Sequence, residues 1–215
     1  MGRRRLLLFL GSAIAIFGGM YVISSALATL RTLDLVEAER DTWQRPAEVL
    51  RALDLKEGNT VADVGSGVGY FTLKISPVIG GRGRVLAVDL RRMSLTFLWI
   101  RKLARPPHNV HLIVGEEDDP HLPPGGVDAV LIANTYHEFR HPRAMMARIF
   151  PALRAGGRLV VVDRGPGPVA DGHEVAMQAV ARELQQEGFE ILYGEDPFVR
   201  RPGDDSWWLL VSRKP

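Results

Sequence analysis

The sequence is most informative at Val61-Ala62-Asp63-Val64-Gly65-Ser66-Gly67-Val68-Gly69, where an apolar run leads into three alternate glycines. Glycine accepts a positive φ and lets a ligand approach the backbone closely. The stretch that follows is helical in pattern, and the N-terminus of a helix offers backbone N–H groups without intrahelical partners. These residues therefore predict a strand, a tight loop and a helix arranged to hold a ligand.

The details of the loop indicate which ligand it holds. The dinucleotide fingerprint G-x-G-x-x-G needs glycine at position 70, where this chain has Tyr70. A carboxylate at Asp63 would repel a pyrophosphate but attract a cationic amino group. Asp89 ends the next predicted strand, about 20 residues after Gly69, where a carboxylate can accept hydrogen bonds from ribose hydroxyls. The pattern favours a nucleoside that carries an amino acid.

Apolar, β-branched runs alternate with helical stretches along the rest of the chain. Such alternation predicts a Rossmann-like α/β fold, a seven-stranded, mostly parallel sheet with helices on both faces. The last two strands lack room for a helix between them, so we expect an antiparallel C-terminal hairpin at the sheet edge. The predicted strands are 60–64, 84–90, 110–114, 127–133, 157–163, 189–194 and 206–212, and the predicted helices are 47–55, 70–78, 92–104, 142–154 and 173–187.

From about Trp43 to the C-terminus the chain resembles the class I S-adenosylmethionine-dependent methyltransferases. The resemblance rests on the D-x-G-x-G-x-G loop, the acid at Asp89, the segment VDAVLIANTYHEF (127–139) and the segment LRAGGRLVVVDRG (153–165), in that order. It implies S-adenosylmethionine as the cofactor. The stretch RDTWQRP (40–46) resembles the lead-in of a bacterial subset of these proteins.

The resemblance also implies roles for individual residues. The loop and its acid would hold the methionine part of the cofactor, Asp89 the ribose, and an acid after the third strand the adenine amino group. The run Glu116–Asp119 holds four consecutive acids that spacing does not separate, and Asp118 is the residue we predict. The predicted cofactor-binding residues are Asp63, Gly65, Gly67, Gly69, Asp89, Asp118 and Asn134.

The substrate side is predicted where strand 127–133 ends, at Asn134-Thr135-Tyr136-His137-Glu138-Phe139. Ligands of open α/β sheets bind beyond the carboxyl ends of the strands. His137 is the candidate catalytic base, because an imidazole titrates near neutrality, and Tyr136 would orient the substrate. The alternative is that His137 caps the next helix or pairs with Glu138. The other histidines lack metal-ligand spacing, so we predict no metal site.

The composition excludes several classes of protein. The chain has 215 residues, of which 46% are hydrophobic and 24% charged, and it has no cysteine. A disulfide framework, a thiolate metal site and a cysteine nucleophile are therefore excluded. The net charge of +2 comes from Arg3, Arg4 and Arg5, without which 24 basic residues face 25 acidic ones. We expect no binding to nucleic acid, which would need a basic face. The oligomeric state is left open.

The N-terminus predicts a membrane segment. No charged residue lies between Leu6 and Leu30, and a helix of that length would measure about 37 Å against a hydrocarbon core of about 30 Å. We predict a single-pass anchor over 6–30, a juxtamembrane connector over 31–45 and a methyltransferase domain over 46–215. A signal peptide cleaved near Ala28 is the alternative.

Function and location follow from these expectations. The leading hypothesis is methyl transfer from S-adenosylmethionine to a small-molecule or lipid-like acceptor. A membrane-tethered module that binds cofactor without catalysis, or serves as a scaffold, is the alternative. The N-terminal arginines favour an external domain, whereas a cofactor made in the cytosol favours a cytoplasmic one, which we predict.

Overall fold

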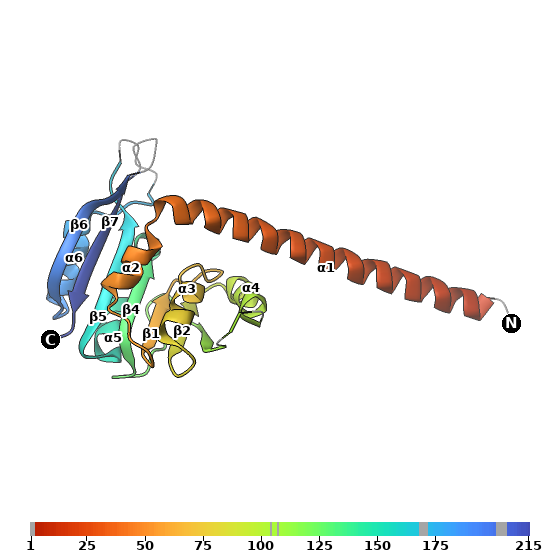
Figure 1. The fold of residues 1–215 in the computed structure, drawn as a ribbon, viewed down its shortest axis with the longest axis horizontal. Helices are drawn as coiled ribbons and strands as arrows, with labels where there is room; N and C mark the ends of the chain where they lie inside the picture. The colour runs from red at the N-terminus through yellow and green to blue at the C-terminus, as the bar shows by residue number, and fades with distance from the viewer. Residues whose placement is uncertain (1–2, 104, 107, 168–171, 201–205) are drawn as a thin grey trace. The chain divides into compact units, whose positions relative to one another are not determined.

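The structure is a computed structural model, and it describes residues 3–103, 105–106, 108–167, 172–200 and 206–215. The chain divides into two compact units, Met1–Thr42 and Trp43–Pro215. The first unit consists of one long helix, α1, which runs from Arg3 to Trp43 (Figure 1). Among the described residues, no helix combines the length and the apolar character needed to cross a membrane, so the anchor predicted over 6–30 gains no support.

The second unit is built on a seven-stranded sheet with the strand order β3-β2-β1-β4-β5-β7-β6. Strands β1 to β5 pair in parallel, while β7 runs antiparallel to both β5 and β6. The predicted Rossmann-like sheet and its antiparallel hairpin are confirmed. The strands are β1 (Thr60–Val64), β2 (Arg84–Asp89), β3 (Val110–Val114), β4 (Val127–Ala133), β5 (Leu153–Arg164), β6 (Glu190–Arg200) and β7 (Ser206–Arg213).

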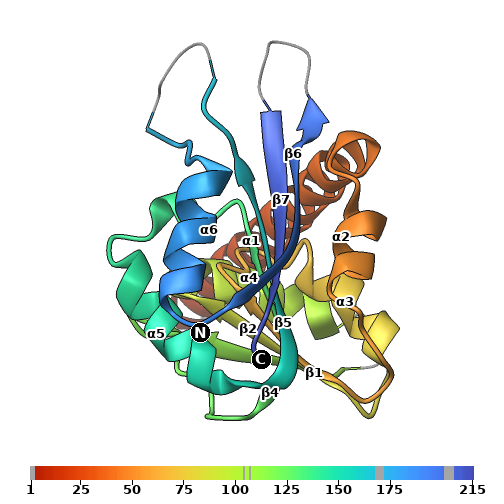
Figure 2. The ribbon, with the colours of Figure 1, turned by 90° about the vertical axis from the view of Figure 1, so that its left-hand side faces the viewer.

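Helices cover both faces of this sheet (Figure 2). Successive strand residues point to opposite faces, so Val61 belongs to one hydrophobic core and Ala62 to the other. The first core packs against α2, α3 and α4, and the second against α5 and α6. The helices are α2 (Pro46–Ala52), α3 (Thr72–Ile79), α4 (Arg92–Leu103), η1 (Tyr136–Glu138, a 3₁₀ turn), α5 (Pro142–Ala152) and α6 (Met177–Gln186).

Two details of the sequence explain where the elements begin. Pro46 and Pro142 each open a helix, a position at which the missing N–H of proline costs no hydrogen bond. The carboxylate of Asp128 on β4 accepts the backbone N–H of Thr60 at 2.7 Å and also pairs with Arg154, so it ties the starts of β1, β4 and β5 together.

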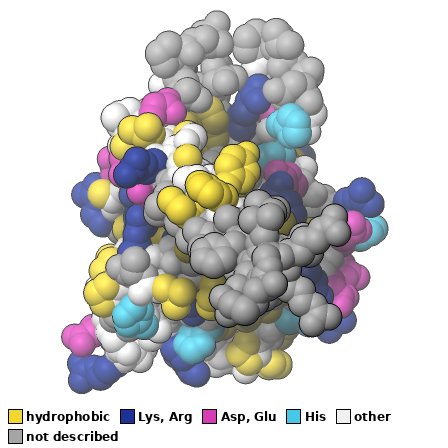
Figure 3. All heavy atoms as spheres, turned by 90° about the vertical axis from the view of Figure 1, so that its right-hand side faces the viewer, with side chains coloured by type: hydrophobic (Ala, Val, Ile, Leu, Met, Phe, Trp, Pro, Cys, Tyr) yellow, Lys and Arg dark blue, Asp and Glu magenta, His cyan; other side chains and the backbone are white. Residues whose placement is uncertain are grey.

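Apolar side chains reach the surface on part of the second unit. Hydrophobic and basic side chains lie next to one another on the face shown in Figure 3. Met93, Trp99 and Leu103 of α4 are at least half exposed, as is Leu90 at the end of β2. A surface of this kind is uncommon on a protein that meets only water.

The sheet order reverses between β1 and β4, because β2 and β3 lie on one side of β1 while β4 and β5 lie on the other. This point is where open α/β sheets bind ligands. The ends of β1, β2 and β4 carry Gly65, Asp89 and Asn134, so the predicted site residues from distant parts of the sequence meet there.

Tyr136 belongs to the second core, and its hydroxyl connects η1 to α6 by donating a hydrogen bond to Glu183 Oε2 at 2.5 Å. Tyr136→Phe removes this hydrogen bond to a carboxylate, and the free energy of unfolding should fall by about 1.5–3 kcal/mol. Urea denaturation measures the change. Tyr193→Phe is the matched control, because Tyr193 is 48% exposed on β6 and should leave stability within about 0.5 kcal/mol. Equal stability of the two variants would contradict the packing described here.

Candidate active site

The glycine loop crosses the end of the sheet against β4. Gly65 has a φ of +79°, and a Cβ at this position would collide with the Thr135 side chain. The N–H groups of Gly65 and Ser66 both donate to Val88 O at 2.9 Å, which fixes the loop on β2. Glycine is therefore required at position 65 both by the backbone conformation and by the close approach of β4.

The next two glycines have different reasons to be there. A Cβ on Gly69 would collide with Leu98 of α4, so this glycine allows the loop to pack against a helix. A Cβ on Gly67 would meet nothing within 4 Å, so the backbone there borders open space. Ser66, which precedes Gly67, is 93% buried, and its hydroxyl has no hydrogen-bond partner within the part of the chain that the structure describes. Both observations fit a loop shaped for a ligand.

The carboxylate of Asp89 holds two backbone segments of the site in place. It is 5% exposed, and its Oδ2 accepts the N–H of Gly67 at 2.8 Å while its Oδ1 accepts the N–H of Arg91 at 2.7 Å. A carboxylate offers about four lone-pair positions, so two remain for ribose hydroxyls. Asp89 therefore holds the loop in place and can also bind a ligand.

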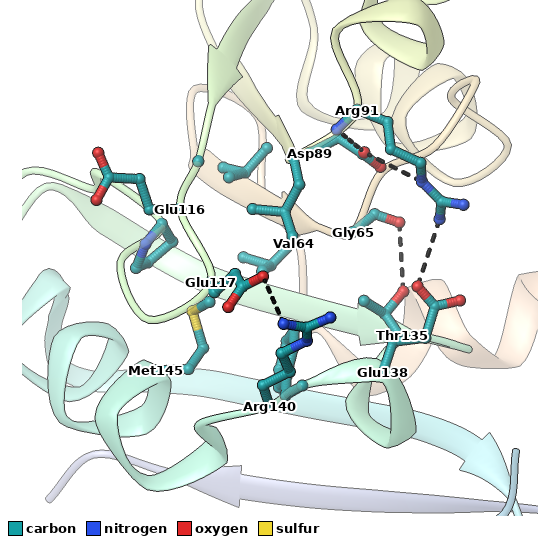
Figure 4. A pocket seen from close by; sticks show the side chains of 15 residues that line it. Val64, Gly65, Asp89, Arg91, Glu116, Glu117, Thr135, Glu138, Arg140 and Met145 are labelled. Atoms are coloured by element: carbon teal, nitrogen blue, oxygen red, sulfur yellow. Dashed lines mark hydrogen bonds and ion pairs between the residues drawn. The ribbon is translucent and has the colours of Figure 1, made fainter. Parts of the chain in front are cut away.

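A cavity of about 300 Å³ opens beside these residues (Figure 4). Its wall combines the ends of β1 and β2 with the loops that follow β3 and β4. Arg91 reaches from Asp89, 3.8 Å away, to Glu138, 3.4 Å away, so it bridges two sides of the cavity. The residues that line it are Val64, Gly65, Val88, Asp89, Leu90, Arg91, Gly115, Glu116, Glu117, Pro120, Thr135, Glu138, Phe139, Arg140 and Met145.

The acidic run after β3 contributes Glu116 and Glu117 to this wall. Asp118, which the sequence favoured, is exposed and is not one of the lining residues. Asp119 instead accepts the backbone N–H of His121 at 2.7 Å. The geometry therefore favours Glu116 or Glu117 as the acid nearest a bound adenine.

Asp63 lies deeper than the sequence suggested. It is 3% exposed on β1, its Oδ2 accepts the Thr72 hydroxyl at 2.5 Å, and it is not among the residues that line the cavity. In this conformation Asp63 connects the end of β1 to the start of α3. Its predicted contact with the amino group of the cofactor stays a prediction.

Asn134 closes the end of β4 in a left-handed conformation, with a φ of +54°. Asparagine is among the few residues that tolerate this region. Trp207 Nε1 donates to Asn134 Oδ1 at 2.9 Å, and because an indole is only a donor, the contact fixes the orientation of the amide. The Trp207 ring in turn packs on Trp43, with centroids 4.8 Å apart. Asn134 is not among the residues that line the cavity, so its predicted contact with the cofactor stays a prediction.

His137 has a partner that the sequence analysis did not name. Its Nδ1 lies 2.7 Å from Asp163 Oδ1, and its backbone N–H donates to Asp163 Oδ2 at 3.1 Å. The hydrogen bond to this carboxylate raises the pKa of His137 above its ordinary value, against the lowering effect of burial. Glu138, the partner expected from the sequence, lies 4.0 Å from Nε2.

Tyr136 points into the core and away from the expected substrate side. It is 4% exposed, packs on Phe139 and is absent from the cavity wall. Burial, together with the hydrogen bond to Glu183, raises the pKa of its hydroxyl. The structure therefore gives Tyr136 a packing role and offers no support for the predicted role in orienting substrate.

Two residues of the site, Asp163 and Arg91, were missed by sequence reasoning. Asp163 is the last residue but one of β5 and lies beside the end of β4, because the two strands pair in parallel. Arg91 and Glu138 form an ion pair across 47 residues of sequence, and no local pattern indicates such a contact.

Comparison with known proteins agrees with this geometry. Residues 62–159 match the family described as "Methyltransferase domain". The curated C-methyltransferase UbiE of ubiquinone/menaquinone biosynthesis from Azotobacter vinelandii is 26% identical over 137 residues, which are 60% of this chain and 54% of that protein. The chain thus spans about half the length of the curated relatives it matches.

Two solved structures share the fold. An S-adenosylmethionine-dependent methyltransferase from Aquifex aeolicus superimposes with a TM-score of 0.67 and 24% identity, over 79% of this chain and 89% of that one. Phosphoethanolamine N-methyltransferase 2 of Haemonchus contortus, in complex with S-adenosyl-L-methionine, superimposes with a TM-score of 0.68 and 15% identity, over 80% of this chain and 53% of that one.

Fold, loop and domain match agree with one another. Residues 62–159 match a methyltransferase domain, and the chain shares its fold with S-adenosylmethionine-dependent methyltransferases. The cofactor of these proteins is S-adenosylmethionine, and the residues present fit it. The cavity offers the carboxylate of Asp89 for ribose hydroxyls and the acids Glu116 and Glu117. The adjoining glycine loop offers open space at Gly67 and the buried Ser66 hydroxyl, which has no hydrogen-bond partner among the described residues.

The role of Asp89 can be tested directly. Asp89→Ala removes the acceptor for ribose hydroxyls and the anchor of the Gly67 N–H, so the affinity for S-adenosylmethionine should fall by about 1.5–3 kcal/mol for each hydrogen bond lost. Isothermal titration calorimetry measures the change. Glu57→Ala is the control, since Glu57 precedes β1, pairs with Arg82 at 2.9 Å and does not line the cavity. Unchanged affinity of Asp89→Ala would refute the assignment.

Proposed function

We propose that this protein transfers a methyl group from S-adenosylmethionine to a small-molecule or lipid-like acceptor. The observation that carries the proposal is the cavity between Asp89 and the glycine loop, at the point where the strand order reverses. The family match supports the same reaction class.

The demands of the reaction agree with the residues at the site. S-adenosylmethionine supplies a methyl group on a sulfonium, and sulfur leaves as a neutral thioether. No acid is then needed, and the protein contributes mainly by aligning the acceptor and excluding water. Asp89 and the loop would fix the nucleoside, and Asn134 and His137 lie at the neighbouring strand end where the acceptor would approach. We assign His137 as the base.

The acceptor class is supported by the relative from Azotobacter vinelandii, which is named for ubiquinone and menaquinone biosynthesis. A quinone precursor is an acceptor with an apolar body.

The location of the protein is a separate proposal that rests on the sequence. The uncharged stretch from Leu6 to Leu30 supports a membrane tether, and a cofactor made in the cytosol supports a cytoplasmic domain. An apolar acceptor would accumulate in the same membrane, so tethering would raise its local concentration.

Ligand-induced stabilisation tests the proposed activity. S-adenosylmethionine and S-adenosylhomocysteine should each raise the melting temperature of the purified protein, because a ligand that binds only the folded state stabilises it. NAD should leave the melting temperature unchanged, since Tyr70 replaces the third glycine of the dinucleotide fingerprint. A shift with NAD alone would indicate an oxidoreductase, and no shift with any of the three would indicate a scaffold.

A reporter enzyme fused after Pro215 tests the location. A reporter that works only in the cytoplasm should be active, and the fusion protein should stay in the membrane pellet after alkaline extraction. A reporter active only outside the cell would contradict the cytoplasmic proposal. Complete release by alkali would contradict the tether.

A further inference from the structure

The structure places a buried carboxylate directly behind the proposed base. Asp163 ends β5 and is 0% exposed, whereas the His137 side chain is 11% exposed. Three donors converge on this carboxylate: Nδ1 of His137 at 2.7 Å, the N–H of His137 at 3.1 Å and the N–H of Arg164 at 2.7 Å. A buried carboxylate that accepts three hydrogen bonds is held in one orientation, unlike the carboxylate of a surface ion pair.

The contact determines which nitrogen of His137 carries the proton. An ionised carboxylate only accepts hydrogen bonds, so Nδ1 must be the protonated nitrogen. The lone pair of the neutral imidazole is then on Nε2. In this arrangement the buried carboxylate binds one nitrogen of the imidazole and leaves the other nitrogen able to accept a proton, so the acid orients the base.

The other ring nitrogen, Nε2, lies close to residues of the cofactor cavity. Thr135 and Glu138 both line this cavity, whereas His137 itself is not one of the lining residues, and Nε2 is 4.0 Å from Glu138 Oε1. The other groups that face the imidazole are Arg164, which opposes protonation, and His173, whose ring lies edge-on with centroids 5.5 Å apart. Of these groups, Asp163 is the one whose carboxylate forms hydrogen bonds with His137.

We propose that Asp163 is a positioning residue that holds His137 as the base for an acceptor with an acidic hydroxyl, a phenol or an enol. This inference rests on the proposed methyl transfer and goes further by naming the acceptor class. A phenol has a pKa of about 10, within reach of an imidazole paired with a carboxylate. An aliphatic alcohol, with a pKa close to that of water at about 15.7, is a far weaker acid, so the same base activates a phenol or an enol more readily.

The proposed reaction moves one proton from the acceptor to His137 and one methyl group from sulfur to the acceptor oxygen. The acceptor O–H bond breaks, and its proton passes to His137 Nε2. An oxygen lone pair forms the bond to the methyl carbon while the carbon–sulfur bond breaks, and its electron pair stays on sulfur. The products are the methyl ether, S-adenosylhomocysteine and an imidazolium held by Asp163, which then releases its proton to solvent.

The dyad is tested on the protein alone by NMR of ¹⁵N-labelled histidine. The His137 signals should show protonation at Nδ1 and a pKa above the ordinary imidazole value. Asp163→Asn, which keeps the size of the side chain, should lower that pKa, because the anionic partner is lost. His121 is the internal control, since it lies on the surface after the acidic run, and its signals should be the same in both proteins. A neutral His137 protonated at Nε2, or an unchanged pKa in Asp163→Asn, overturns the dyad.

The acceptor class is tested with 1-naphthol, 1-naphthylamine and 1-thionaphthol, which share one ring system and differ in the nucleophilic atom. Transfer of radioactive methyl from S-adenosylmethionine should favour the naphthol. His137→Gln and Asp163→Asn should each reduce kcat for the naphthol by about 10²-fold or more with little change in KM. In Asp163→Asn the acid limb of the pH–rate profile should move to lower pH, a change that a purely structural role would not produce.

The outcomes separate this inference from the proposed function. Failure of the wild-type protein to bind S-adenosylmethionine in calorimetry would overturn the proposed function. Normal binding with an unaltered pH profile in Asp163→Asn would overturn the dyad alone. Normal binding with no methylation of the naphthol, or with methylation of the amine or thiol only, would overturn the acceptor class.

Discussion

The site depends on how closely two parallel strands approach at their carboxyl ends. Gly65 directly follows β1 and Thr135 lies just after β4, and the backbone at Gly65 lies against the side chain of Thr135. No Cβ fits between them. This contact fixes the direction in which the chain leaves β1, and hence the position of the loop, the start of α3 and the cavity beside Asp89. Any larger residue at position 65 would move all of them together.

Two buried carboxylates organise the ends of the strands in the same way. Asp89 on β2 accepts backbone N–H groups from Gly67 and Arg91, and Asp163 on β5 accepts those of His137 and Arg164. In each case a carboxylate satisfies N–H groups that a turn leaves without partners. Each carboxylate can also accept a further hydrogen bond, which would come from a ribose hydroxyl at Asp89 and comes from the imidazole of His137 at Asp163.

Local sequence patterns predicted most of the fold because they report local forces. The apolar runs, the glycines and the prolines that open α2 and α5 each act within a few residues, and the strands they predicted are present. Asp118 and Tyr136 are instructive because the family resemblance placed the first at the site and its position after a predicted strand placed the second. Which of four neighbouring acids turns toward the cavity, and whether a tyrosine after β4 points inward to Glu183, depend on packing between distant elements. The pairing of His137 with Asp163 likewise depends on the parallel pairing of β4 and β5, which brings their carboxyl ends together.

The position of β7 has a consequence for how the protein is made. This strand comes after β6 in the chain but lies between β5 and β6 in the sheet, and its Trp208 is fully buried in the second core. While the ribosome is still translating these residues, β5 has an unpaired edge that other nascent chains could join. The sheet is complete only when β7, the later of the two strands in the chain, has emerged and inserted between β5 and β6.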